Sequence, residues 1–269
     1  MGEMFDLSAL QQLLVGTEFS EKLHLFPSIE STNTYAMQQA AKGAPHGSVY
    51  VAEEQTAGRG RGDHAWHSEP YAGIYVSLLL RPQMAAVDGL WLSLATGLAV
   101  QRAIQNVTGV VTDIRWPNDV LVKGQKIGGI LMEMNAEVSS IRYAVIGIGI
   151  NANHGSFPEE LSGQATSLRL EAGRHIVREE LLVEMLRCLS DEINSLIQPK
   201  GFAAACAGIL QRLELKSTWI RGKQVFVGEG GGYTGVTAGL DEKGFLLVET
   251  SQGLRRVLSG GVREPTPKG

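Results

Sequence analysis

The sequence of 269 residues lacks several features that would assign a protein to a class directly. It has no excess of positive charge, because its formal net charge is −4 at pH 7, and this argues against broad nucleic-acid binding. Its two cysteines, Cys188 and Cys206, have no metal-ligand spacing and indicate buried thiols in a reducing compartment. No N-terminal stretch joins a basic region to an apolar core, so we recognise no targeting segment.

Long apolar runs are also missing. The longest, around residues 90–100, is interrupted by Ser93, Thr96 and Gly97, and it is too short and too polar to span a bilayer. With 43% hydrophobic and 19% charged residues, the chain is expected to be globular and not disordered. We therefore expect a soluble cytoplasmic protein with no membrane partner.

The common motifs for nucleotides, nucleophiles and metals are absent as well. There is no G-x-x-x-x-G-K-[ST] loop, and the glycine-rich segment at 58–62 does not read G-x-G-x-x-G or lead shortly into a helix. No Ser-His-Asp or Cys-His arrangement is apparent. The histidines His64, His67 and His154 have no metal spacing, so we interpret each as a surface or hydrogen-bonding residue and assign no metal ligand.

What is present is a succession of strand and helix patterns. Apolar and alternating runs predict strands at 22–27, 48–54, 73–81, 113–116, 120–122, 127–134 and 143–150. Helical spacing predicts helices at 7–15, 32–41, 87–107, 177–197 and 201–213, with Ser31 as the N-cap of the second. These elements make an α+β chain in which helices flank a mixed β-sheet.

Near residue 216 the pattern changes to short strands separated by glycine turns. Strands are expected at 218–221, 224–227, 234–240, 245–249 and 255–258. Five short strands in so few residues favour a small SH3-like barrel. We therefore predict two domains, comprising residues 1–214 and 215–269.

The most informative segment is QTAGRGRGDHAW, at residues 55–66. It places three glycines and two arginines in five consecutive positions after an apolar, strand-like run. Glycines let a backbone fold tightly around a ligand, and Arg59 and Arg61 offer planar charged groups suited to phosphate and carboxylate oxygens. An isolated GRGRG segment is equally typical of a surface turn, so the other motifs have to decide.

Two further motifs follow on neighbouring strands. In Arg115-Trp-Pro-Asn118-Asp119, the proline fixes a turn that presents an amide and a carboxylate at a strand end; the alternative is an Asx-turn between strands. In Lys126-Ile-Gly128-Gly129, a lysine opens an apolar strand that two glycines would weaken unless a ligand or another backbone approaches closely. The alternative is a solvated hairpin lysine.

A third motif is Gly147-Ile-Gly149-Ile-Asn151. Alternate glycines in a buried strand leave one face open as a floor for a flat ligand, and Asn151 stands at the carboxyl end of that strand. The alternative is tight packing under a helix.

GRGRG followed closely by Trp66, then RWPND, KIGGILME and GIGIN, in that order, resemble the biotin protein ligases. The resemblance runs from about residue 26 to residue 262 and includes the small barrel, and it implies the class II synthetase-like fold of that family. The resemblance is to the monofunctional type, because we do not recognise in this sequence the residues that would form the N-terminal DNA-binding winged helix of the bifunctional members. A lipoate or octanoate ligase of the same superfamily is the alternative, and a nucleic-acid binder using the arginine loop is a more distant one.

The resemblance implies an ATP-dependent ligase with Mg²⁺ bound to the triphosphate. Biotin would be activated as biotinyl-5′-AMP and passed to a specific lysine of the biotin carboxyl carrier protein of acetyl-CoA carboxylase. Four residues would be catalytic. Lys126 would neutralise charge between the biotin carboxylate and the α-phosphate. Arg59 and Arg61 would bind carboxylate and phosphate oxygens as the loop closes. Asp119 would orient the acceptor lysine.

The resemblance also implies two sets of binding residues. Biotin would contact Ser31, Thr32, Asn33, Gln55, Gly58, Arg59, Gly60, Arg61, Lys126, Gly128, Gly129 and Gly147. ATP and the adenylate would contact Arg61, Trp66, Arg115, Asn118, Asp119, Lys126 and Asn151.

Two features leave expectations open. Many bacterial members have another arginine where this loop reads Gly62-Asp63-His64-Ala65, which is expected to change how tightly the adenylate is held. The role of Arg263 near the C-terminus stays open. Family members often pair sheet edges into homodimers, so the resemblance makes a homodimer possible, although the sequence shows no interface signal. DNA is not an expected partner.

Overall fold

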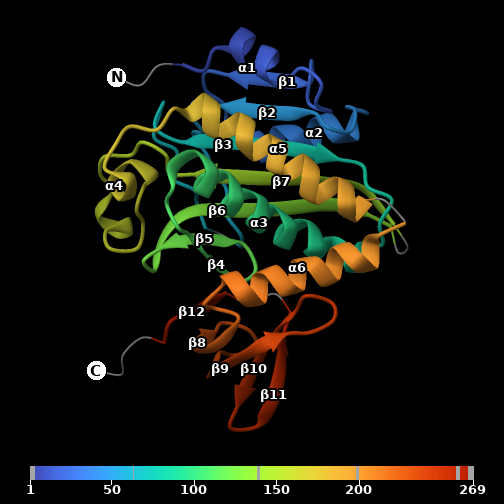
Figure 1. The fold of residues 1–269 in the computed structure, drawn as a ribbon, viewed down its shortest axis with the longest axis vertical. Coiled ribbons are helices and arrows are strands. Elements are labelled where there is room, and N and C mark those ends of the chain that lie inside the picture. The colour runs from blue at the N-terminus through green and yellow to red at the C-terminus, as the bar shows by residue number, and fades with distance from the viewer. Residues whose placement is uncertain (1–3, 63, 138–139, 198–199, 259–260, 266–269) are drawn as a thin grey trace.

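The computed structural model describes residues 4–62, 64–137, 140–197, 200–258 and 261–265. These residues form two β-sheets, of which the larger is mixed and has the strand order β1-β2-β3-β7-β6-β5-β4 (Figure 1). Its strands are β1 (Leu23–Phe26), β2 (Val49–Ala52), β3 (Ile74–Leu80), β4 (Asp113–Arg115), β5 (Asp119–Val122), β6 (Gln125–Ala136) and β7 (Ile141–Ile150). β1 and β2 are parallel, and each of the other neighbouring pairs is antiparallel. The prediction of an α+β chain with a mixed sheet is confirmed.

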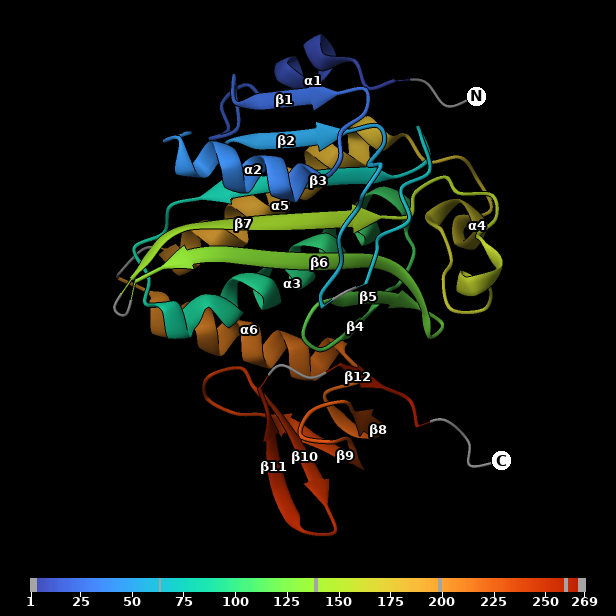
Figure 2. The same ribbon diagram turned by 180° about the vertical axis from the view of Figure 1, so that it is seen from behind.

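Helices cover both faces of this sheet. α3 (Gly89–Thr108) and α5 (Arg178–Ile197) lie on one face, with α6 (Phe202–Lys216) beneath them (Figure 1). α2 (Thr32–Ala41) and the segment that follows β2 cross the other face (Figure 2). Because both faces are covered, β3 is buried along its whole length. The shorter elements are α1 (Leu7–Leu13), α4 (Leu168–Ala172) and the 3₁₀ turns η1 (Ala86–Asp88) and η2 (Glu159–Leu161).

The start of α2 confirms a prediction. Ser31 is the N-cap residue, and its side chain accepts a hydrogen bond from the backbone N–H of Thr34 at 3.4 Å. The cap brings the first turn of α2 against the middle of the sheet, where Thr32 and Asn33 are buried. Polar side chains are thereby held at a buried position on the sheet.

The smaller sheet is antiparallel and has the order β11-β10-β9-β8-β12. Its strands are β8 (Arg221–Val227), β9 (Tyr233–Leu240), β10 (Leu246–Thr250), β11 (Gly253–Val257) and β12 (Val262–Arg263). The separate strands predicted at 218–221 and 224–227 were wrong, because Gly222 (φ 76°) lies at a bulge within β8 and not at a turn between strands. The fifth strand is β12, which pairs with β8.

The two sheets meet at the RWPND motif and at the residues around it. The indole Nε1 of Trp116 donates a hydrogen bond to the carbonyl oxygen of Gly244 at 2.9 Å. A Cβ added at Gly244 would stand 2.8 Å from Leu94 of α3, so the turn before β10 packs closely on the larger layer. The Ser217 hydroxyl donates to the Ile114 carbonyl at 2.6 Å, which fixes the end of α6 against β4.

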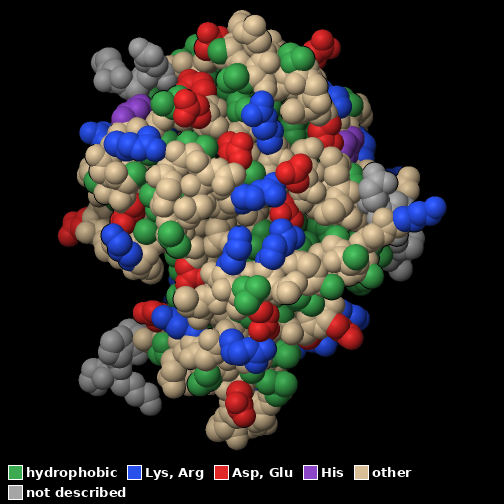
Figure 3. All heavy atoms as spheres, in the orientation of Figure 1, with side chains coloured by type: hydrophobic (Ala, Val, Ile, Leu, Met, Phe, Trp, Pro, Cys, Tyr) green, Lys and Arg blue, Asp and Glu red, His purple; other side chains and the backbone are tan. Residues whose placement is uncertain are grey.

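Two properties of the whole chain bear on its partners. No helix among the described residues has the length and apolar character needed to cross a bilayer. Over the face that carries α3 and α5, Lys and Arg side chains are interspersed with Asp and Glu side chains (Figure 3). That face therefore offers no uniformly basic surface.

Candidate active site

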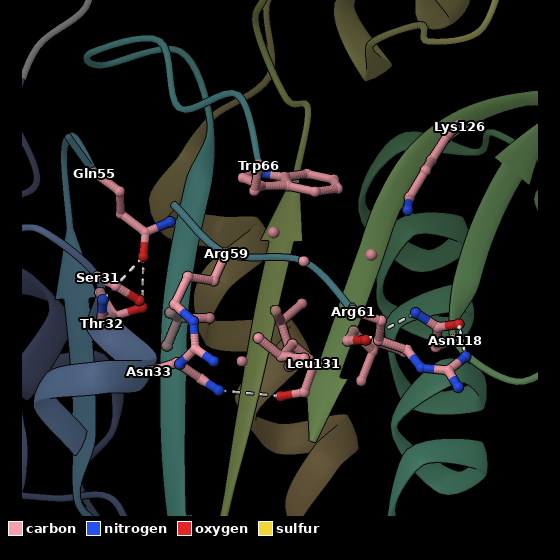
Figure 4. Close-up of a pocket in the computed structure, with 17 residues that line it drawn as sticks. Ser31, Thr32, Asn33, Gln55, Arg59, Arg61, Trp66, Asn118, Lys126 and Leu131 are labelled. Carbon is pink, nitrogen blue, oxygen red and sulfur yellow. Dashed lines mark hydrogen bonds between the residues drawn. The ribbon is translucent and has the colours of Figure 1, made fainter. Parts of the chain in front are cut away.

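A narrow pocket lies on the sheet face that carries α2 (Figure 4). In Figure 4, Ser31, Thr32 and Gln55 stand at one end, and Lys126 and Asn118 at the other. The lining residues come from α2, the 58–66 loop and strands of the larger sheet: Ser31, Thr32, Asn33, Gln55, Arg59, Gly60, Arg61, Trp66, Val76, Asn118, Lys126, Gly129, Ile130, Leu131, Gly147, Ile148 and Gly149.

One end of the pocket is polar and carries no full charge. Gln55 Oε1 accepts hydrogen bonds from the backbone N–H of Thr32 at 2.9 Å and from its hydroxyl at 3.1 Å. The Ser77 hydroxyl lies 2.8 Å from Thr32 Oγ1 and 2.9 Å from Asn33 Oδ1. Thr32, Asn33 and Ser77 are buried, and Gln55 is partly buried. Because these groups fix one another, they form a preorganised set of donors and acceptors.

The floor of the pocket is made by glycines on β6 and β7. A Cβ added at Gly147 would collide with the Asn33 side chain, and one at Gly149 would collide with the Trp66 indole. At Gly129 an added Cβ would stand 2.8 Å from the same indole. These positions lack side chains because Asn33 and Trp66 lie directly on the backbone of the sheet.

Gly128 lies differently from what the sequence led us to expect. A Cβ at this residue would meet Ile150 Cδ1 at 2.9 Å, and Gly128 is not among the lining residues. Successive residues of a strand point to opposite faces, so Gly129 opens to the pocket and Gly128 to the core. Gly149 has the orientation that was predicted for Gly128, and it lines the pocket.

The 58–66 loop is a narrow hairpin. The Gly58 carbonyl accepts from the Trp66 N–H at 2.9 Å, and the Gly60 N–H donates to the His64 carbonyl at 2.7 Å. A Cβ at Gly58 would stand 2.5 Å from the Trp66 carbonyl, so only glycine allows the two arms to approach this closely. Asp63 lies outside the described residues.

The two loop arginines have different partners. Arg59 donates to both carboxylate oxygens of Glu133, at 3.0 and 2.9 Å. Arg61 donates to Asn118 Oδ1 at 3.0 Å. Burial lowers the pKa of Arg61, although the Asp119 carboxylate opposes the shift. Arg61 is therefore a partly buried cation beside the motif that carries Asn118 and Asp119.

Asp119 lies between two cations. The Lys126 ammonium is 2.6 Å from Oδ1, and Arg115 donates to Oδ2 from Nε at 3.1 Å and from Nη2 at 2.6 Å. Burial raises the pKa of Asp119, but Lys126 and Arg115 outweigh this effect and hold the pKa below its ordinary value. The carboxylate is therefore ionised at neutral pH and fixes the direction of the Lys126 side chain.

Lys126 also contacts Trp66. Its ammonium lies 5.4 Å from the centroid of the indole, a cation–π geometry. The Trp66 Nε1 is buried and has no hydrogen-bond partner among the described residues. The lysine and the tryptophan thus close the pocket from the side that leads to a second, larger space.

That larger cleft shares Gly60, Arg61, Trp66, Asn118 and Lys126 with the pocket. Its other lining residues include Arg115, Asp119, Asn151 and Arg263. Asn151 uses its Nδ2 to donate to the carbonyls of Thr166 at 3.1 Å and Lys126 at 3.4 Å. The side chain of Arg263 lies over the Phe226 ring, with 4.8 Å between the guanidinium carbon and the ring centroid.

The structure therefore brings the predicted residues into two connected spaces. The pocket is lined by Ser31, Thr32, Asn33, Gln55, Arg59, Gly60, Arg61, Lys126, Gly129 and Gly147, and the cleft adds Arg115, Asp119 and Asn151. Gly58 lines neither space but closes the base of the loop hairpin.

Sequence reasoning missed Ser77 and Glu133. Ser77 is a lone polar residue in the apolar run of β3, and Glu133 ends the KIGGILME motif. Both departures from the apolar pattern were visible, but nothing in the sequence indicated that Ser77 faces Thr32 or that Glu133 faces Arg59.

Comparison with known proteins gives a consistent result. The profile of the biotin/lipoate A/B protein ligase family matches residues 25–151. The chain is 36% identical over 245 residues to the bifunctional ligase/repressor BirA of Bacillus subtilis, covering 87% of this chain and 71% of the relative. It is 37% identical over 169 residues to a biotin–[acetyl-CoA-carboxylase] ligase of Mycobacterium tuberculosis, 61% of each chain.

Solved structures agree with the sequence relatives. The biotin protein ligase from Aquifex aeolicus in complex with biotin and ATP superposes with a TM-score of 0.78 at 29% identity, covering 91% of this chain and 100% of that chain. An apo structure of the same ligase superposes with a TM-score of 0.74 at 27% identity, covering 91% of this chain and 99% of that chain.

Proposed function

Because this chain belongs to the biotin/lipoate A/B protein ligase family, we propose that it activates biotin with ATP and transfers it to a protein lysine. The relatives that support biotin over lipoate are named as biotin ligases. One structural observation carries the proposal. A single pocket has a neutral hydrogen-bonding end at Thr32 and Gln55 and a cationic end at Arg61 and Lys126.

Biotin has the matching polarity. Its ureido ring presents two N–H donors and one carbonyl acceptor, and its carboxylate lies at the end of an apolar chain. We place the ring against Ser31, Thr32 and Gln55, and the carboxylate toward Lys126. A site of this kind rejects acids that lack the polar ring, because its own buried groups would be left unpaired.

The first half-reaction needs two anions held together. A carboxylate oxygen of biotin attacks the α-phosphorus of ATP, the bond to the β-phosphate oxygen breaks, and pyrophosphate leaves. Lys126 would lie between the carboxylate and the phosphate, and Arg61 would neutralise phosphate oxygens from the loop. Fixed cations in a partly enclosed site lower the barrier mainly by positioning and by stabilising charge.

The nucleotide would occupy the larger cleft. Arg115, Asn118 and Asn151 line it, and Trp66 stands where the cleft and pocket join. Mg²⁺ takes oxygen ligands and enters with the triphosphate. Asn151 fits beside it, since its Nδ2 is directed to backbone carbonyls and its Oδ1 is available.

In the second half-reaction the neutral amine of the acceptor lysine attacks the acyl carbonyl, AMP leaves with the electron pair of the anhydride bond, and the amide nitrogen releases its extra proton to water. Asp119 would attract and orient the incoming lysine. Its lowered pKa makes it a weak proton acceptor, so we assign it positioning and not proton removal. The 58–66 loop would shield the anhydride from water.

Several finer features belong to the same proposal. The acceptor is the biotin carboxyl carrier protein of acetyl-CoA carboxylase, and the reaction takes place in the cytoplasm. The boundary between the two domains lies between residues 214 and 215, close to the end of α6 at Lys216. A homodimer that pairs sheet edges stays a prediction, which size-exclusion chromatography with light scattering would check.

The proposal is tested by pyrophosphate release. The protein is incubated with ATP and Mg²⁺, and with biotin or lipoate in parallel. We expect release that depends on biotin, followed by labelling of a carrier domain. Release with lipoate alone would establish the alternative ligase, and no release with either acid would contradict the adenylation mechanism.

A further inference from the structure

His67 and His154 are far apart in the sequence but lie close together beside the 58–66 loop. One ring nitrogen of His67, one ring nitrogen of His154 and one carboxylate oxygen of Glu69 all lie within 4.8 Å of one another. The ring centroids of the two histidines are 5.8 Å apart. His67 and Glu69 follow Trp66 at the end of the 58–66 loop, and His154 follows β7. The fold thus assembles a ligand set that no local spacing indicates.

A hydrogen-bond chain fixes the tautomer of His154. The Tyr75 hydroxyl donates its single hydrogen to the backbone carbonyl of Glu69 at 2.9 Å. Its oxygen lies 3.3 Å from His154 Nε2, and it can only accept there. Nε2 therefore carries the imidazole hydrogen, and Nδ1 presents a free lone pair.

That lone pair is buried and unused. His154 is 0% exposed, and its Nδ1 has no hydrogen-bond partner among the described residues. A buried polar atom without a partner is costly, and it calls for a ligand that accepts the lone pair. Stacking on Phe157, at 5.3 Å and 9° between the rings, holds the imidazole in this orientation.

The chemistry of the His154 side chain suits a metal ligand. Neutral imidazole nitrogen is a preferred ligand of zinc-like ions, and a ligating histidine usually donates its other N–H to a second group. Tyr75 is placed to be that second group.

We propose that His67, Glu69 and Nδ1 of His154 bind a divalent transition-metal ion such as Zn²⁺. Two imidazoles and one carboxylate suit such an ion and leave a fourth position open, whereas Mg²⁺ prefers oxygen ligands alone. His67 lines the larger cleft, which gives the ion a route of entry. The exposed side chain of Glu69 can rotate to close the ligand set.

The bound ion would join two segments that flank the pocket. One is the returning arm of the 58–66 loop, and the other is the chain after Asn151. A metal at this point would fix the base of the loop without touching the substrates. The inference does not depend on the proposed ligase function, because it concerns metal binding by the protein alone.

The test is a Zn²⁺ titration of untagged, chelator-treated full-length protein, followed by calorimetry, with Co²⁺ absorption as a report on coordination geometry. We expect one Zn²⁺ per chain and the absorption typical of a tetrahedral Co²⁺ site. His67→Ala and Glu69→Gln, both at partly exposed positions, should each weaken Zn²⁺ binding at least tenfold. His64→Ala is the matched control, because His64 lies in the same loop but outside the cluster, and it should bind as the wild type does.

A second measurement separates a built site from adventitious binding. Tyr75→Phe removes the partner of Nε2 while keeping the ring, and loss of such a second group typically weakens metal binding about 10- to 100-fold. Zn²⁺ should raise the melting temperature of the wild type and of His64→Ala, but not that of His67→Ala. Absence of Zn²⁺ binding, or equal binding by the wild type and His67→Ala, would overturn the proposal and leave His154 a buried structural histidine.

Discussion

Glu133 on β6 holds Arg59 through two hydrogen bonds, at 3.0 and 2.9 Å, so that the glycine–arginine loop is fastened across the sheet. The same carboxylate accepts from Asn33 Nδ2 at 2.8 Å. Arg59 was predicted to contact the substrate carboxylate and phosphate. Its observed partner indicates that it also secures the loop over the pocket.

The first prediction follows from this pair. Glu133→Gln should increase the hydrogen-exchange rate of the backbone amides in residues 58–62, because the loop loses its charged anchor. Stability should change by no more than about 1 kcal/mol, since Arg59 and Glu133 are 47% and 25% exposed and such pairs contribute little. Unchanged exchange in the loop would show that Glu133 does not hold it.

Lys126 gives a second prediction. Lys126→Ala should reduce biotin-dependent pyrophosphate release by about 100-fold or more, because the cation between carboxylate and phosphate is lost. Lys123→Ala is the control, since Lys123 is on the adjacent turn, 80% exposed, and paired with Glu171 outside the pocket. Equal activity of wild type and Lys126→Ala, with the fold verified by circular dichroism, would refute the role assigned to Lys126.

The third prediction concerns retention of the adenylate. Arg61→Ala removes the hydrogen bond to Asn118 and a partly buried cation beside the cleft. A loss of about 1.4 kcal/mol in adenylate binding would speed its escape about tenfold. We expect biotin to appear on lysines of a bystander protein, measured by mass spectrometry. Arg142→Ala, on a surface ion pair with Glu137, should label faithfully, and equally faithful labelling by Arg61→Ala would count against the loop as a shield.

Asp119 predicts a pH dependence of stability. Its pKa is lower in the folded protein than in the unfolded chain, so folding is favoured wherever the carboxyl is ionised. The contribution is complete above the ordinary carboxyl pKa of about 4 and is lost as the pH falls through the lower folded-state pKa. Asp119→Asn should therefore cost about 1–3 kcal/mol at pH 7 and progressively less in acid, measured by urea unfolding. A cost that stays constant from neutral pH into acid would rule out this linkage.

The glycine floor supplies the fifth prediction. Gly149→Ala would displace the Trp66 indole from the sheet, and overpacking of this kind typically costs about 1–3 kcal/mol. We expect weaker biotin binding and an altered tryptophan emission spectrum. Gly208→Ala in α6, where an added Cβ meets nothing within 4 Å, is the matched control. Wild-type binding and emission in Gly149→Ala would mean that the indole does not need the bare backbone.

The strands of the larger sheet and the helices that cover it were predictable, because their patterns of apolar residues are long and repetitive. α2 begins at Thr32 and ends at Ala41, as the Ser31 cap and helical spacing indicated. β8 was divided in error because Gly222 is equally compatible with a turn and with a bulge, and only pairing with β9 decides between them. β12 was missed since two residues are too few to give a periodic signal.

The candidate site was predictable where one motif presents its residues together. It was less predictable where the pleat of a strand sets which face a residue points to, or where pairing with a distant strand sets its neighbours. Asn118 and Asp119 share one turn, so their proximity followed from the sequence. Gly128 and Gly129 could not be told apart, because the face of each depends on register with β7. The proximity of His67 to His154 arises only when β3 and β7 pair, which no local pattern encodes.

The hydrogen bond from Trp116 to Gly244 has a consequence for how this chain can be recombined. A chimera that takes residues 1–214 from this protein and its C-terminus from a homologue would keep the indole but replace its acceptor and the turn that covers Leu94. The RWPND segment, which presents Asn118 and Asp119, would then rest on a foreign surface. Functional chimeras should therefore inherit the 241–245 turn together with the tryptophan, even though a crossover point near residue 215 looks natural.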